Sequence, residues 1–181
     1  MNNEKIIILG AKNINKFDLA KLLIDKDEEL DLAPIFSTND IYKDKYSIEI
    51  KYLSPEDITI GYKNNAFLYV SSDKDYISSG ITLDDVDNSD ILCMNISDFN
   101  NISNIIFSKY NFLIIWLDTK YRDKNYNIKE DIVETKYLIE KLDYFNYMYF
   151  LDEDYEDISD IIIKYLKSSE EEKEKILNEN L

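Results

Sequence analysis

The sequence predicts a three-layer α/β domain with a mainly parallel central sheet. Short, uniformly apolar runs recur along the chain, which is the pattern of strands buried on both faces of a sheet. Segments with apolar residues at helical spacing separate most of these runs, and strand–helix–strand units produce parallel pairing. The chain has 181 residues, which is enough for one domain with its own core.

The expected central sheet is built from the apolar runs. They lie at residues 5–9, 33–36, 91–95, 112–117 and 147–151. The run at 112–117 (Phe-Leu-Ile-Ile-Trp-Leu) is the most strongly strand-like. None of the runs leaves a polar face for water, so we expect helices on both faces of the sheet.

Helices are predicted where apolar residues recur every three or four positions. These segments are residues 17–23, a stretch through 102–106, 128–142 and 154–166. Residues 46–72 alternate instead between apolar and polar, which predicts a small β-rich insertion. We therefore expect one α/β domain over residues 1–168, followed by a charged tail, 169–181, that is a helical or frayed extension.

The composition excludes several classes of function. The net charge of −16 argues against a nucleic-acid partner, because attraction to phosphates needs a basic surface. The chain has no histidine, which excludes histidine triads, histidine metal sites and histidine general bases. No apolar run approaches the ~18 residues of a membrane span, so we expect no membrane partner.

The expected location is the cytoplasm. No signal peptide is visible, because the chain opens directly into a strand-like run. A single cysteine, Cys93, excludes an intramolecular disulfide and fits a reducing compartment. The basic residues are 20 lysines and Arg122, beside abundant Ile, Asn and Tyr. This bias indicates an AT-rich genome, such as that of some viruses, phages, low-GC bacteria or parasites, and a viral protein would lie in the host cytoplasm or the virion.

The loop after the first run matches part of a phosphate-binding pattern. Residues 10–17 read Gly-Ala-Lys-Asn-Ile-Asn-Lys-Phe, and the pattern is G-x-x-x-x-G-K-[ST] between a strand and a helix. Gly10 and Lys16 stand at its first glycine and its lysine. Asn15 replaces the second glycine, and asparagine is the residue type after glycine that best tolerates a left-handed backbone. Phe17 has no hydroxyl for Mg²⁺. An ordinary strand–turn–helix with a surface lysine explains this segment equally well.

With three further segments, the loop resembles the P-loop nucleoside monophosphate kinases, and guanylate kinases most closely. Residues 37–38 (Ser-Thr) are similar to the start of the Ser/Thr-rich nucleotide-binding segment of that family. Residues 69–72 (Tyr-Val-Ser-Ser) resemble its Tyr-Gly-Thr-Ser segment, which helps to hold the acceptor nucleotide. Residues 142–152, followed by 156–158, resemble its last strand and closing helix. The resemblance extends over nearly the whole chain in order and pattern.

This resemblance implies that the insertion at 46–72 is of the nucleotide-binding type, and it implies a set of site residues. The catalytic ones would be Lys16 and Arg122, on phosphates. The nucleotide-binding ones would be Gly10, Asn13, Asn15, Lys16, Ser37, Tyr69 and Ser71. The implied cofactors are ATP and Mg²⁺ if the protein is active, and none otherwise.

The departures from the family lie at its catalytic positions. Arginines follow the Ser/Thr segment in guanylate kinases, whereas residues 39–43 here are Asn-Asp-Ile-Tyr-Lys. Cys93 and Asn95 stand where their third core strand ends in acidic residues, and only Arg122 is available for the lid. One arginine contributes ~10³–10⁵ in the rate of phosphoryl transfer. We therefore expect a guanylate kinase-like protein with impaired or absent catalysis, retained as a nucleotide-binding or protein-interaction module. The alternative is an active kinase that transfers the γ-phosphate of ATP to GMP or a related nucleotide.

Other features have simpler explanations. Asp84, Asp85, Asp87 and Asp90 form a cluster whose spacing lacks the EF-hand pattern, so we expect no metal site. The tyrosines are expected mainly as core or interface residues. A protein partner or a homo-oligomer is compatible with this reading.

Overall fold

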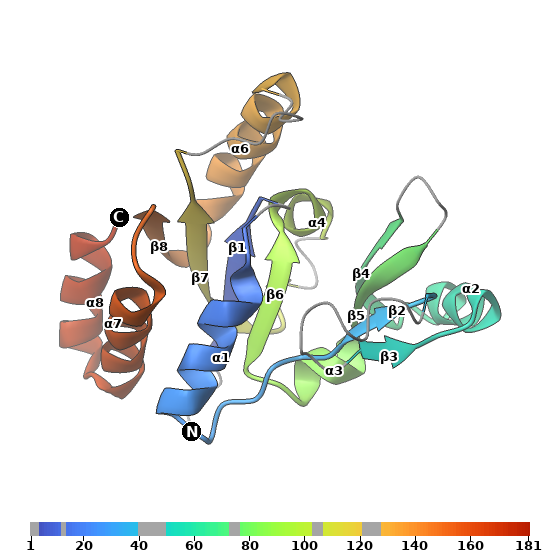
Figure 1. Cartoon of the computed structure of the whole chain (residues 1–181), viewed down its shortest axis with the longest axis horizontal. Helices are drawn as coiled ribbons and strands as arrows, with labels where there is room; N and C mark the ends of the chain where they lie inside the picture. The colour runs from blue at the N-terminus through green and yellow to red at the C-terminus, as the bar shows by residue number, and fades with distance from the viewer. Residues whose placement is uncertain (1–3, 12–13, 40–49, 73–76, 103–106, 121–127) are drawn as a thin grey trace.

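The computed structural model of the chain describes residues 4–11, 14–39, 50–72, 77–102, 107–120 and 128–181. These residues form two sheets, each of four strands (Figure 1). The central sheet has the order β6-β1-β7-β8, and the smaller sheet has the order β3-β2-β5-β4. The prediction of an α/β fold with a mainly parallel central sheet and a smaller β unit is confirmed.

All pairs in the central sheet are parallel. Its strands are β1 (Glu4–Gly10), β6 (Ile91–Asn95), β7 (Asn111–Asp118) and β8 (Asn146–Leu151). Four of the predicted runs therefore form this sheet. The register places Ile8 between Cys93 and Ile115, so the apolar runs lie side by side.

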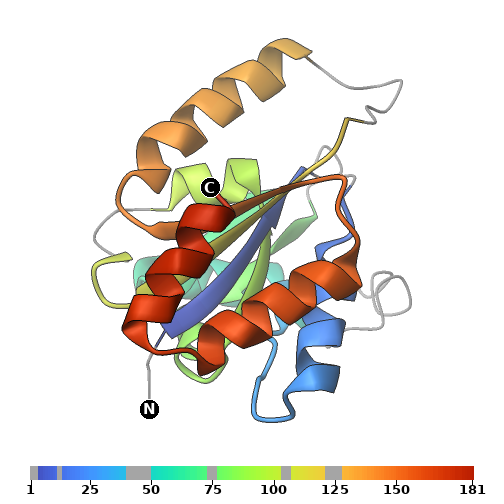
Figure 2. The same ribbon diagram turned by 90° about the vertical axis from the view of Figure 1, so that its left-hand side faces the viewer.

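Helices cover both faces of the central sheet, as its uniformly apolar strands predict. Ile6 and Ile8 pack on one side with α1 (Lys16–Lys26), α7 (Tyr155–Lys167) and α8 (Glu170–Glu179). Figure 2 shows α7 and α8 lying across this face. Ile7 and Leu9 point to the other side and pack with α4 (Ile96–Asn101) and α6 (Ile128–Leu142). The alternation along β1 thus divides the core into two layers.

The run at 33–36 is not part of the central sheet, and that prediction is wrong. Leu32 forms one parallel bridge with Ile91, and the amide of Ala33 donates a 2.8 Å hydrogen bond to the Ile91 carbonyl. Pro34 has no N–H, so it cannot extend this ladder. The chain then enters the smaller sheet as β2. The strands of that sheet are β2 (Ile35–Ser37), β3 (Ile50–Tyr52), β4 (Phe67–Ser72) and β5 (Ser78–Thr82).

Two short helices lie outside the predicted ones. The segment 46–72 contains β3 and β4, with residues 46–49 outside the described part of the chain, and also α2 (Pro55–Lys63). A capping box between Ser54 and Asp57 starts α2, with proline in its first turn, and both features favour a helix start. The second is α3 (Leu83–Asp87), which Thr82 caps.

Most remaining helices follow the sequence pattern closely. The helix expected through 102–106 falls mainly on residues 103–106, which lie outside the described ranges, and the described helix α4 ends before it, at Asn101. Residues 170–179 of the charged tail form α8, which packs against α7 and β8. Among the described helices, none is both long enough and apolar enough to cross a membrane.

Candidate functional site

The carboxyl ends of β1, β6 and β7 meet at one edge of the central sheet, and the loop after β1 lies there. β1 ends at Gly10 and α1 begins at Lys16. A Cβ at Gly10 would lie 3.2 Å from the side chain of Ile14 and 3.3 Å from the carbonyl oxygen of Leu117. The absence of a side chain at Gly10 therefore lets the loop pack closely against the end of β7.

The ammonium of Lys16 points back into its own loop. It donates hydrogen bonds of 3.0 Å to the carbonyl oxygens of Ala11 and of Ile14. The side chain is buried, and Lys16 is only 5% exposed. The thiol of Cys93, on β6, lies 3.7 Å from the Lys16 carbonyl as a weak donor. Lys16 is therefore a buried cation at the sheet edge and not a surface lysine.

Two neighbouring groups affect the charge of Lys16. Burial lowers its pKa to about 8, and Cys93 and Asp98 oppose this shift. Burial also raises the pKa of the Cys93 thiol to about 12, so the thiol is neutral at pH 7. Asp98 is therefore the neighbour whose negative charge supports the protonated form of Lys16 at neutral pH.

Asp98 is a site residue that the sequence analysis missed. It lies on α4, is buried, and accepts a 3.0 Å hydrogen bond from the side-chain amide of Asn95. Asp98 also helps to raise the pKa of Tyr69, although burial of the phenol is the larger cause. A carboxylate thus lies near both Lys16 and Tyr69. The sequence held one signal for this contact. An asparagine at the start of a helix lies close to the residue three positions later, and the residue three positions after Asn95 is Asp98.

The smaller sheet presents a row of hydroxyls, which we call the hydroxyl face. Ser79 on β5 pairs with Ser37 on β2 and with Ser71 on β4, so the three side chains share one face. Tyr69 lies two residues before Ser71 and shares that face. Because Tyr69 packs against the core cluster that includes Leu9, the hydroxyl face turns toward the central sheet. Ser79 is the second residue that the sequence analysis missed, and the run Ser-Ser-Gly at 78–80 was its only signal.

Asn15 and Phe17 differ from what a phosphate-binding loop requires. Asn15 has a φ of −82°, so it does not adopt the left-handed conformation that asparagine tolerates. Its exposed side chain instead donates a 2.6 Å hydrogen bond to Asp18, in the first turn of α1. Phe17 is partly buried and packs against the core beneath α1, where it offers no ligand to a metal.

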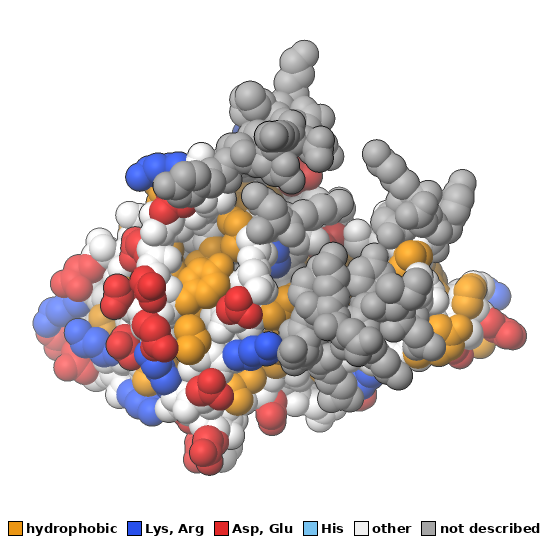
Figure 3. All heavy atoms as spheres, in the orientation of Figure 1, with side chains coloured by type: hydrophobic (Ala, Val, Ile, Leu, Met, Phe, Trp, Pro, Cys, Tyr) orange, Lys and Arg blue, Asp and Glu red, His pale blue; other side chains and the backbone are white. Residues whose placement is uncertain are grey.

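A cavity of about 440 Å³ adjoins the loop, between the ends of β7 and β8 and the start of α7. Its lining includes Ile14 and three carboxylates, those of Asp118, Asp152 and Glu153. Asp152 accepts a 2.5 Å hydrogen bond from the hydroxyl of Thr119. None of the described residues that line it is a lysine or arginine. Figure 3 shows acidic side chains, interspersed with lysines, over the left-hand part of the molecule, where Figure 1 places α7 and α8.

The structure brings together most of the predicted site residues that it describes. Lys16 and Tyr69 share Asp98 and Cys93 as electrostatic neighbours. Ser37 and Ser71 flank Ser79. The predicted residues Asn13 and Arg122 lie outside the described ranges.

The aspartates of residues 84–90 point to separate partners. Asp85 accepts hydrogen bonds from Thr82 and Lys51, and Asp87 accepts one from Tyr110. In the part of the chain that the structure describes, no group of three or more acidic or cysteine side chains is arranged to hold a metal ion.

Comparison with known proteins gives a similarity to solved structures. No family model matches the sequence, and no curated protein matches it. The crystal structure of guanylate kinase from Anaplasma phagocytophilum superposes with a TM-score of 0.54, over 92% of this chain and 86% of that one. This chain has a guanylate kinase-like fold. The two sequences are 14% identical, so the similarity concerns the fold alone.

Proposed function

We propose that this guanylate kinase-like protein binds a nucleotide between the loop 10–16 and the hydroxyl face, and transfers a phosphoryl group slowly or not at all. The main support is the environment of Lys16. It is a buried cation at the carboxyl edge of a parallel sheet, where α/β folds bind ligands, and its ammonium is bonded to carbonyl oxygens of its own loop.

The binding half of the proposal rests on groups that suit a phosphate and an acceptor nucleotide. Lys16 lies at the start of α1, and the N–H groups at a helix start favour an anion. The hydroxyls of Ser37, Ser71 and Ser79 share one face of the small sheet with Tyr69, and Tyr69 has the same electrostatic neighbours as Lys16. An arriving phosphate replaces the carbonyl partners of Lys16 with a charged one, which strengthens its hydrogen bonds.

The catalytic half rests on groups that are missing or already engaged. Phe17 packs into the core, so the hydroxyl that normally helps to hold Mg²⁺ is lacking at this position. The N–H groups of Ile14 and Lys16 already donate to carbonyl oxygens within the loop. The adjoining cavity places Asp118, Asp152 and Glu153 near the loop, and carboxylates repel the phosphates of ATP. The residues thus suit a phosphate better than a Mg²⁺–ATP complex.

Nucleotide titrations test the binding half. We expect measurable binding of at least one of GMP, ADP and ATP by calorimetry, with little dependence on Mg²⁺. Lys16→Met should weaken it about tenfold or more, since a hydrogen bond to a charged group contributes roughly 1.5–3 kcal/mol. The matched control is Lys21→Met, further along α1, which should bind as the wild type does. Absence of binding to any nucleotide, or equal affinity in the two variants, would contradict the proposal.

An activity assay tests the catalytic half. With ATP, Mg²⁺ and each nucleoside monophosphate, we expect turnover far below the usual ~1–10³ s⁻¹ of enzymes. Turnover in that range with GMP or another monophosphate would establish the alternative, an active kinase. Binding without turnover is the result that we expect.

A further inference from the structure

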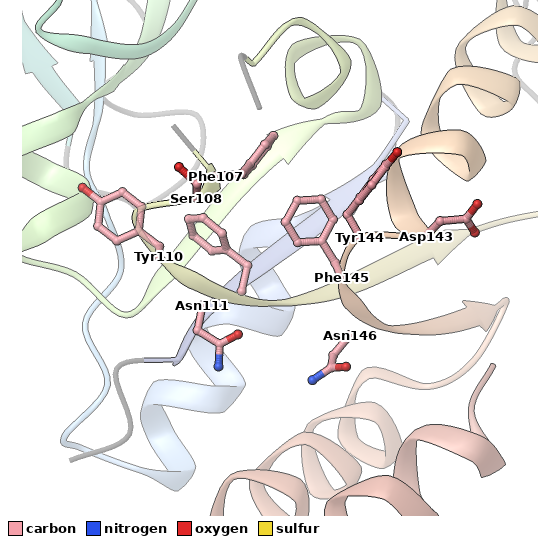
Figure 4. A pocket seen from close by; sticks show the side chains of 9 residues that line it. Phe107, Ser108, Tyr110, Asn111, Asp143, Tyr144, Phe145 and Asn146 are labelled. Atoms are coloured by element: carbon pink, nitrogen blue, oxygen red, sulfur yellow. The ribbon is translucent and has the colours of Figure 1, made fainter. Parts of the chain in front are cut away.

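A second cavity, of about 630 Å³, opens at the amino ends of β7 and β8 (Figure 4). Asn111 and Asn146, which begin these two strands, both line it. It therefore lies at the opposite edge of the central sheet from Lys16 and is independent of the nucleotide site. Its volume is within the range of ~300–1,000 Å³ of small-molecule sites.

The walls of this cavity are mostly aromatic. Five of its nine lining side chains are Phe or Tyr. The ring centroid of Phe107 lies 5.7 Å from that of Phe112 and 5.0 Å from that of Phe145. The ring of Tyr110 continues this wall, with its centroid 5.5 Å from that of Phe112. Figure 4 shows Tyr110 on one side of the cavity and Phe145 with Tyr144 on the other. Tyr144 is 78% exposed, so it stands at the mouth and is accessible to a ligand.

The charges around these rings favour a cation. Asp143 is the one charged residue among the nine that line the cavity. Two ammonium groups already occupy part of this wall, since Lys141 lies 4.8 Å from the centroid of Phe107 and Lys5 lies 5.8 Å from that of Tyr110. The aromatic surface left for a cationic ligand is therefore that of Tyr144 and Phe145, next to Asp143. Aromatic faces attract cations by about 0.5–2 kcal/mol each. The net charge of −16 further favours a positive ligand over a negative one.

A neighbouring recess extends the cavity. It has a volume of about 380 Å³ and shares Asp143, Phe145 and Asn146 with the first. The carboxylate of Glu174, on α8, is part of its lining. A linear molecule with a positively charged group at each end can therefore meet Asp143 in the cavity and Glu174 in the recess.

We propose that this double cavity binds a small linear organic cation with a guanidinium or ammonium head. The head lies against the aromatic wall near Asp143, and the tail extends toward Glu174. The amide oxygens of Asn111 and Asn146 are acceptors for its N–H groups.

Calorimetry with agmatine, a linear molecule with a guanidinium and an ammonium end, tests the proposal against neutral butylurea. We expect agmatine to bind at least about tenfold more tightly than butylurea. Tyr144→Ala should weaken agmatine binding about threefold to tenfold, as the loss of one cation–aromatic contact implies. The matched control is Tyr137→Ala, because Tyr137 is also exposed, at 59%, but does not line the cavity.

A second pair of variants separates local from general electrostatics. Asp143→Asn should weaken agmatine binding, whereas Asp25→Asn, at an exposed position on α1, should leave it unchanged.

A blocked arginine tripeptide identifies the source of the cation. Tighter binding of agmatine supports a free cation, and tighter binding of the tripeptide supports an arginine side chain. Undetectable binding of agmatine at millimolar concentration, equal binding of butylurea, or equal effects in the paired variants would overturn the proposal.

Discussion

The phenolic hydroxyl of Tyr165, on α7, donates a 3.1 Å hydrogen bond to the carboxylate of Glu4, the first residue of β1. The ammonium of Lys173, on α8, lies 3.5 Å from the other oxygen of the same carboxylate and 5.1 Å from the centroid of the Tyr165 ring. Glu4 is 9% exposed and Lys173 is 5% exposed. A buried ion pair thus connects the two carboxyl-terminal helices to the first strand.

Removal of one member of this pair should destabilise the protein strongly. Lys173→Met leaves the Glu4 carboxylate buried without its cation, and such a loss costs about 3–5 kcal/mol. The matched control is Lys175→Met on the same helix, where an exposed pair with Glu171 at 3.5 Å contributes about 0.5 kcal/mol or less. Urea unfolding should show a much lower midpoint for the first variant. Equal midpoints would show that the pair does not stabilise the fold.

A methyl group at Gly80 should disturb the small sheet. A Cβ there would lie 2.1 Å from the carbonyl oxygen of Tyr69 and 2.9 Å from the ring of Phe36. Because the nearest atom is backbone, β5 must move away from β4, and we expect Gly80→Ala to cost about 1–3 kcal/mol. Gly10→Ala is the milder comparison, since its nearest atoms are 3.2 Å away in the Ile14 side chain. Thermal unfolding of both variants checks this order, and a lower midpoint for Gly10→Ala would contradict it.

The ammonium of Lys141 should stabilise the end of α4. It donates hydrogen bonds of 2.8, 3.2 and 2.7 Å to the carbonyl oxygens of Phe99, Asn100 and Ile102. Lys141→Met leaves these acceptors without that donor, so we expect a loss of about 1–3 kcal/mol in the free energy of unfolding. Lys136→Met, on the same helix, removes only an exposed pair with Glu140 at 4.0 Å and should change stability little. A similar loss in both variants, measured by urea unfolding, would refute the role of Lys141.

The strands of the central sheet were the most predictable part of the fold. Runs such as Phe112 to Leu117 are apolar on both faces, and only a strand covered by helices on both sides buries them fully. The run at 33–36 is also apolar, but Pro34 ends its short pairing with β6. A local pattern does not say which sheet a strand joins, because that choice depends on pairing partners far away in the sequence.

Order along the chain identified Lys16 on the loop and Ser37, Tyr69 and Ser71 on the small sheet. The burial of Lys16 and its bonds to Ala11 and Ile14 depend on how the loop packs against neighbouring strands. Asp98 and Ser79 were missed for the same reason. Each becomes a site residue through α4 or β5, elements whose position relative to the loop is a tertiary property.

The pKa of Lys16 makes one contribution to stability depend on pH. Burial lowers this pKa from its usual 10.5 to about 8, so between these values the unfolded chain binds more protons than the folded one. Stability from this residue therefore rises with pH in that window. From pH 8 to pH 9.5 the rise is about 1.5 kcal/mol.

Comparison of the wild type with Lys16→Met isolates this contribution. The pKa of Lys141 is also lowered to about 8 by burial, but Lys141 is present in both proteins and its effect cancels in the difference. The effect of Tyr165 also cancels, but burial and Glu4 raise its pKa, so above pH 10 both proteins lose stability from this residue. Measurements should therefore end at pH 9.5, where both are still folded. Urea unfolding at several pH values from 7.5 to 9.5 should show the wild type gaining stability relative to Lys16→Met. A difference that stays constant over this range would mean that Lys16 has a normal pKa and is hydrated, contrary to its burial in the loop.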